Sequence, residues 1–218
     1  MPIRELSKWG RQIRSKDRVY LFDDFSCLYP DRALWNSSSE SRFDHQVNSN
    51  AFPWAYGVER YSSASGVGGG CFANITSSFA FSVAKHATVK WRMLVGTAAP
   101  TWVRVGLSDS SPATMTNYIC FLFQPGTDSH WICASSTTAG GAVTYTTSIT
   151  PDTSWHVFDI ICTSSSDIRY LIDNTEVGVI STTASIPTVN MMPFVWINQA
   201  GTVSYVYVDY VEAYGERD

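Results

Sequence analysis

The stretch Val203–Tyr214, which reads VSYVYVDYVEAY, constrains the fold most strongly. It contains no glycine or proline, and its Val and Tyr residues suit a pleated, half-buried strand. Strict alternation places Val206, Val208 and Tyr210 on one face and Tyr205, Tyr207, Asp209 and Val211 on the other. Both faces are largely apolar, which predicts an inner strand covered on both sides. Because this strand comes last, the order of strands in its sheet must differ from their order in the sequence, as in Greek-key and jelly-roll topologies.

Short strands separated by turn residues are expected along the rest of the sequence. Asp173-Asn174 predicts a tight turn between two of them. The expected strands are Val19–Phe25, Ser77–Val83, Thr88–Val95, Trp102–Leu107, Asn117–Gln124, His130–Ala134, Ala142–Ile149, Trp155–Thr163, Asp167–Ile172, Glu176–Ile180 and Phe194–Asn198. We therefore predict an all-β sandwich of two antiparallel sheets, formed as one domain by residues 19–218.

Residues 1–18 differ from the rest of the chain in charge. They carry six basic and two acidic side chains, whereas the remaining 200 residues carry nine basic and seventeen acidic ones. We interpret residues 1–18 as a basic N-terminal arm that is either a solvated tail or a docking segment for an acidic partner surface. The residues expected to dock are Arg4, Lys8, Trp9, Arg11 and Arg14.

Several classes of protein are disfavoured by composition. Charged residues make up only 16% of the chain, which argues against a nucleic-acid binder. No apolar run is long enough for a signal peptide or a membrane span, so no membrane partner is expected. The five cysteines are odd in number and lack metal-ligand spacing, so reduced thiols and assembly in a cytosol are expected.

Three segments carry a resemblance to a known group of proteins. The segments WHVFDIICTSSSDIRYLIDNTEVG (155–178), YVDYVEAY (207–214) and VYLFDDF (19–25) resemble strands of concanavalin A-like jelly rolls, including laminarinase-type family 16 glycoside hydrolases. The order DDF, Trp-containing loop, Gly-rich turn, VRVGLSD and DTSWH is more similar to jelly-roll modules of tailed-phage virion and tail-associated proteins. This resemblance implies a virion location, a capsid or tail protein as partner, and a homo-oligomer.

The family 16 resemblance can be tested against its catalytic motif. Retaining glycosidases need two carboxyl groups about 5–5.5 Å apart, and this family supplies them as E-x-D-x-x-E on one strand. The strands expected to hold that motif, Asn117–Gln124 and His130–Ala134, contain no carboxylate. We therefore predict that the chain is not an enzyme; a divergent hydrolase with its acid and base on loops is the alternative.

Aromatic residues suggest a binding role instead, because aromatic rings stack on sugar faces. Trp102, Arg104, Tyr118 and Trp131 are the candidate glycan-binding residues, with burial in the sandwich core as the alternative. The four histidines lack zinc spacing, and His156 at a strand start is expected to make structural hydrogen bonds. The resembling enzymes use an acidic residue of the closing strand to hold a structural calcium ion; for Asp209 we favour a surface position, and no cofactor is expected.

Two functions follow from these observations. The first is a non-catalytic virion structural protein of a tailed phage, either a head decoration or a tail-associated module, which docks through its arm and also binds a surface glycan. The second is a carbohydrate-binding or adhesion module that is not part of a virion.

Overall fold

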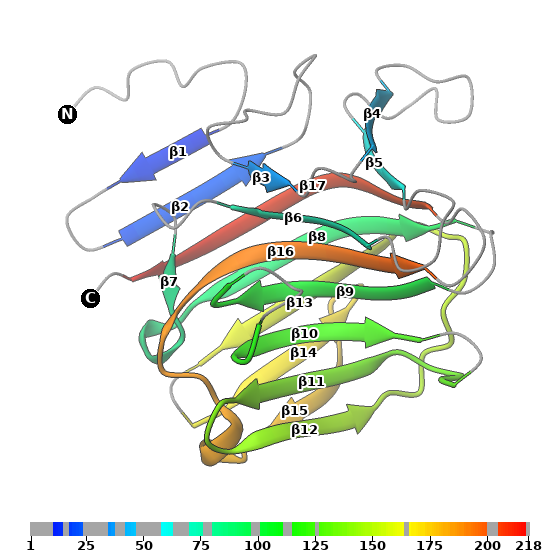
Figure 1. Cartoon of the computed structure of the whole chain (residues 1–218). Coiled ribbons are helices and arrows are strands. Elements are labelled where there is room, and N and C mark those ends of the chain that lie inside the picture. The colour runs from blue at the N-terminus through cyan, green and yellow to red at the C-terminus, as the bar shows by residue number, and fades with distance from the viewer. Residues whose placement is uncertain are drawn as a thin grey trace.

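The computed structural model describes most of the chain. Its described residues are 11–14, 18–23, 35–37, 42–46, 58–62, 70–75, 80–96, 101–110, 115–124, 127–163, 166–199 and 205–216. They form two stacked antiparallel sheets, with two short 3-10 helices, η2 (Val83–Lys85) and η3 (Thr183–Ser185) (Figure 1). The prediction of an all-β jelly-roll sandwich is confirmed. Within the described residues, no helix has the length and hydropathy needed to cross a membrane.

The two sheets contain nine and eight strands. The nine-stranded sheet has the order β1-β2-β17-β8-β13-β14-β15, with β5 also paired to β17 and β4 paired to β5. Its strands are β1 (Arg11–Arg14), β2 (Arg18–Asp23), β4 (Arg42–Gln46), β5 (Val58–Ser62), β8 (Thr88–Val95), β13 (His156–Cys162), β14 (Ile168–Ile172), β15 (Thr175–Ile180) and β17 (Tyr205–Glu216).

The eight-stranded sheet has the order β12-β11-β10-β9-β16-β6-β3, with β7 paired to β16. Its strands are β3 (Trp35–Ser37), β6 (Gly70–Ile75), β7 (Phe81–Ser82), β9 (Thr101–Ser108), β10 (Tyr118–Phe123), β11 (Ile132–Thr137), β12 (Gly141–Thr146) and β16 (Asn190–Gln199). In Figure 1 this sheet lies in front of the strands β8, β13, β14 and β15.

The closing strand β17 is an inner strand, as predicted, and it lies between β2 and β8. Strict alternation fails within it because a bulge shifts the register between Val208 and Tyr210. The bulge turns Val211 to the same buried face as Val206 and Val208 and turns its neighbour Tyr210 to the outer face. The predictions that Val211 lies opposite Val206 and Val208, and that Tyr210 shares their face, are therefore both wrong. The outer face is only partly covered, and its Tyr214 is 48% exposed.

Residues 11–14 of the expected arm form strand β1. This strand pairs with β2 in an antiparallel register from Arg11 opposite Phe22 to Arg14 opposite Val19. It lies at the edge of the nine-stranded sheet, with β2 as its neighbour. Arg11 and Arg14 therefore belong to a sheet strand, whereas Arg4, Lys8 and Trp9 lie outside the described residues.

The core lies between the two sheets and is built from alternate residues of their inner strands. Aromatic rings dominate one region: Phe121 meets Phe158 and Tyr170 at centroid distances of 5.2 Å each. Three described cysteines, Cys120, Cys133 and Cys162, are free and buried, as predicted. Burial raises the pKa of the Cys120 and Cys162 thiols to about 12, so both remain protonated and unreactive at neutral pH.

Candidate functional site

An aromatic cluster with a cation at its centre lies on the outer face of the eight-stranded sheet. Its members come from three neighbouring strands: Trp102 and Arg104 from β9, Tyr118 from β10 and Trp196 from β16. On β9, the alternate residues Val103 and Val105 point into the main core, so Trp102 and Arg104 face outward. Trp196 is directly opposite Arg104 in the register of β9 and β16, which brings the two side chains together.

Arg104 contacts all three rings of this cluster. Its Cζ atom lies 4.8 Å from the ring centroid of Trp196 and 5.6 Å from those of Trp102 and Tyr118. Trp102 and Trp196 also meet edge to face, with centroids 6.3 Å apart. Trp102 is 38% exposed, while Tyr118, Trp196 and Arg104 are half-buried. The cluster therefore presents aromatic surface to solvent, with a half-buried arginine at its centre.

A small second core holds these side chains in place. Cys120, Ala134 and Phe194 are fully buried on this outer face, and Tyr118 and Trp196 pack against them. A ring that packs on one side against buried neighbours loses little conformational freedom when a ligand binds its other side. The cluster is thus a preorganised surface.

Trp131, predicted as part of the glycan-binding surface, is not there. It is only 2% exposed and packs in the main core against Phe158, at a centroid distance of 4.7 Å, and Phe123, at 5.6 Å. The position in the cluster is taken by Trp196, which sequence reasoning missed. Alternation along FVWIN places Trp196 on the face opposite Val195 and Ile197, but the sequence does not show that β16 pairs with β9.

The described strands of the sheet that carries the cluster have no acidic side chain. Among the residues that the structure describes, the eight strands of this sheet contain no Asp or Glu, and Arg104 is their single charged residue. In particular, β10 and β11, which were expected to carry the E-x-D-x-x-E motif in an active enzyme, have none. These strands therefore provide no carboxylate pair for a retaining glycosidase mechanism.

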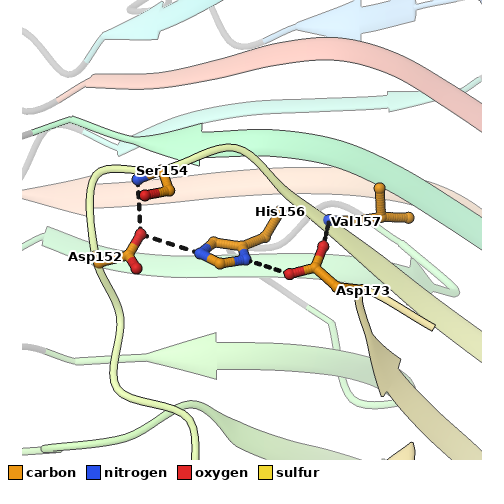
Figure 2. Close-up of polar contacts among 5 residues, drawn as sticks. All are labelled: Asp152, Ser154, His156, Val157 and Asp173. Carbon is orange, nitrogen blue, oxygen red and sulfur yellow. Dashed lines mark hydrogen bonds and ion pairs between the residues drawn. The ribbon is translucent and has the colours of Figure 1, made fainter. Parts of the chain in front are cut away.

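His156, at the start of β13, lies between two carboxylates and contacts both (Figure 2). Its Nδ1 lies 2.6 Å from Asp173 Oδ2 and its Nε2 lies 3.0 Å from Asp152 Oδ1. The carboxylates also accept backbone N–H groups, Asp173 from Val157 and Asp152 from Ser154. The three side chains thus connect the loop before β13 to the turn between β14 and β15, a structural role that agrees with the expectation.

Stability is expected to depend on pH through His156. Burial is the largest influence and lowers its pKa, but hydrogen bonds and charge from Asp173 and Asp152 outweigh it and raise the pKa overall. The Ser154 backbone N–H is the main cause of a lowered Asp152 pKa. The stabilisation by His156 is thus fully present below its unfolded pKa of about 6.5 and is lost as pH rises through the raised folded value; that of Asp152 is lost as pH falls below about 4.

Comparison of the wild type with His156→Gln by urea denaturation tests this prediction. The difference in unfolding free energy is expected to be largest near pH 5 and smaller at pH 9, because the stabilisation by His156 is lost as pH rises through its raised pKa. Because Asp152 and Asp173 are half exposed, the difference should remain below about 1 kcal/mol. An equal difference at both pH values would contradict the assignment.

The carboxylate of Asp209 is paired with an arginine side chain. It forms an ion pair with Arg92 on the outer face of the nine-stranded sheet, next to a second pair in which Lys90 Nζ lies 3.4 Å from Asp159 Oδ2. Among the described residues, no cluster of three His, Cys, Asp or Glu side chains could hold a metal ion. Asp209 lies on the outer face, as favoured, but it is within β17 and the ion pair leaves its side chain half-buried.

The sandwich belongs to the same structural class as the β-glucanase-fold proteins. No family model matches the chain, and no curated protein matches it in sequence. Solved structures match it in fold. They include the endo-β-1,3-glucanase of Pyrococcus furiosus, with 13% identity and a TM-score of 0.63 over 95% of this chain and 98% of that one.

Two other similar structures differ in their described activity. One is an immunostimulatory antigen and pseudo β-1,3-glucanase of Mycobacterium tuberculosis, with 14% identity and a TM-score of 0.64 over 90% of this chain and 98% of that one. The other is a protein of unknown function from Shewanella oneidensis, with 13% identity and a TM-score of 0.64 over 93% and 88%. At such identities the likeness establishes the concanavalin A-like fold alone.

Proposed function

We propose that this protein is a non-catalytic carbohydrate-binding module. The observation that carries the proposal is the cluster of Trp102, Tyr118 and Trp196 around Arg104, on a sheet whose described strands contain no carboxylate. Aromatic rings provide flat apolar surface for the C–H faces of sugars, and a few polar groups set the orientation of the ligand. The similarity of the fold to glucanases and to a pseudo-glucanase supports a saccharide ligand.

Removal of the aromatic surface tests this function. We expect the wild type to bind a subset of glycans on an array, and the double variant Trp102→Ala/Trp196→Ala to lose about tenfold or more in affinity for them, as stacking is worth about 1 kcal/mol per ring. Tyr214→Ala removes an aromatic ring of similar exposure from the opposite sheet and serves as the control. Binding that survives the double variant would remove the proposed surface.

The absence of catalysis is tested separately. Release of reducing sugar from any glycan that binds should be no faster than in buffer, because the described strands of this sheet supply no carboxylate to act as general acid or nucleophile. Hydrolysis that survives substitution of Arg104 and both tryptophans would indicate a catalytic site elsewhere.

We also propose, from the resemblance in sequence order, that the module is carried by a tailed-phage virion and docks through its N-terminal arm. The six basic residues among the first eighteen support an acidic partner surface; because Arg11 and Arg14 lie on β1 and Arg18 begins β2, this edge of the sheet would take part in docking together with the arm. Mass spectrometry of purified virions is the test, and absence of the protein from the particles would overturn this part of the proposal. Glycan binding and a place in a virion are compatible.

A further inference from the structure

We infer that the ligand of the Trp102–Trp196 face is an acidic saccharide, whose anionic group is bound by Arg104. This inference rests on the proposed function and specifies its ligand class. The observation behind it is that Arg104 is the single charged residue among the described strands of this sheet, at the centre of the aromatic cluster.

Within the part of the chain that the structure describes, the positive charge of Arg104 has no counter-ion. The ion pairs of the described residues involve Lys90, Arg92, His156 and Arg169, and none involves Arg104. Its Nε atom is buried and has no hydrogen-bond partner. A guanidinium carries five N–H donors, so a half-buried arginine without an acceptor leaves donors available to a ligand.

The three rings explain how the charge is held there. Aromatic faces stabilise a cation electrostatically, so Trp102, Tyr118 and Trp196 keep the guanidinium on the surface of the sheet. The indole rings of Trp102 and Trp196 contribute no oxygen acceptor to its N–H groups. A ligand with an anionic group would supply one, through short charge-assisted hydrogen bonds.

A neutral sugar would form weaker interactions with Arg104 than an acidic sugar. Its hydroxyl groups form weaker hydrogen bonds to a guanidinium than a carboxylate or a sulfate does, and they leave the charge uncompensated. The planar fork of arginine matches both anionic groups. The ligand therefore combines a sugar ring, which stacks on Trp102 or Trp196, with a carboxylate or sulfate group that reaches Arg104.

Calorimetric titration of the full chain with three oligosaccharide series tests the inference: neutral glucans, uronic acid oligomers and sulfated oligomers of matched length. We expect at least one acidic series to bind about tenfold or more tightly than the neutral one, and more weakly at 0.5 M than at 0.05 M NaCl. The two acidic series distinguish a carboxylate from a sulfate as the recognised group.

Variants of Arg104 test whether this residue causes the preference for acidic over neutral oligosaccharides. Arg104→Gln should abolish the preference for the acidic series, while Arg104→Lys, which keeps the charge but loses the planar fork, should retain part of it. Arg169→Gln is the matched control, because it removes one positive charge from an exposed position on the other sheet. Thermal unfolding of each variant checks that it is folded.

The outcomes separate the two levels of the proposal. Equal affinity for neutral and acidic series, or an acid preference unchanged by Arg104→Gln in a folded protein, overturns the acidic ligand and leaves carbohydrate binding in place. Binding to none of the series and to no glycan on the array overturns the proposed function itself.

Discussion

Trp131→Ala is expected to destabilise the protein by about 3–5 kcal/mol, the usual range for truncation of a buried aromatic residue. Trp131 is 2% exposed and contacts the rings of Phe123 and Phe158 in the main core. Its removal leaves a cavity that these rings cannot fill without losing contacts of their own. Urea denaturation followed by tryptophan fluorescence or circular dichroism measures the loss.

Trp102→Ala is the matched comparison for Trp131→Ala. Trp102 is 38% exposed on the outer face, so its truncation should cost no more than about 1 kcal/mol. Glycan binding should show the reverse order, with a strong effect of Trp102→Ala and little effect of Trp131→Ala in any protein that remains folded. Similar losses of stability in both variants would contradict the assignment of Trp131 to the core and Trp102 to the surface.

Gly106→Ala is expected to destabilise the protein at least as much as Trp131→Ala does. Gly106 lies in β9 between β10 and β16, opposite Cys120 and Phe194. A Cβ atom at this position would lie 2.1 Å from the carbonyl oxygen of Ile119 and 2.7 Å from Cα of Cys120. Both are backbone atoms of the neighbouring strand, so the sheet itself would have to move, and we expect a loss of about 4 kcal/mol or more.

Gly141→Ala separates this steric effect from backbone conformation. Gly141 has a φ of +69°, but a Cβ atom there would have no neighbour within 4 Å. Its replacement should cost only about 1 kcal/mol, the price of a left-handed conformation for an L-residue. If Gly106→Ala unfolds at the same denaturant concentration as Gly141→Ala, the close approach of β9 and β10 is not as the structure shows it.

The strands were predictable because their signals are local. Alternation of apolar residues and turn residues placed β8 at the expected residues, Thr88–Val95, and located β14 and β15 around the Asp173-Asn174 turn. The apolar character of both faces of Val203–Tyr214 placed β17 inside its sheet. The absence of the E-x-D-x-x-E motif can likewise be read directly from the sequence.

The candidate site depended on contacts that no local pattern contains. Pairing between strands about ninety residues apart in the sequence places Trp196 of β16 opposite Arg104 of β9. Trp131, in contrast, is buried in the main core between the two sheets. The bulge in β17 reverses the alternation that had placed Val211 on the wrong face. A sequence determines which residues alternate along a strand; only the tertiary structure decides which strands are neighbours and which face is buried, because register and bulges are set by contacts between distant segments.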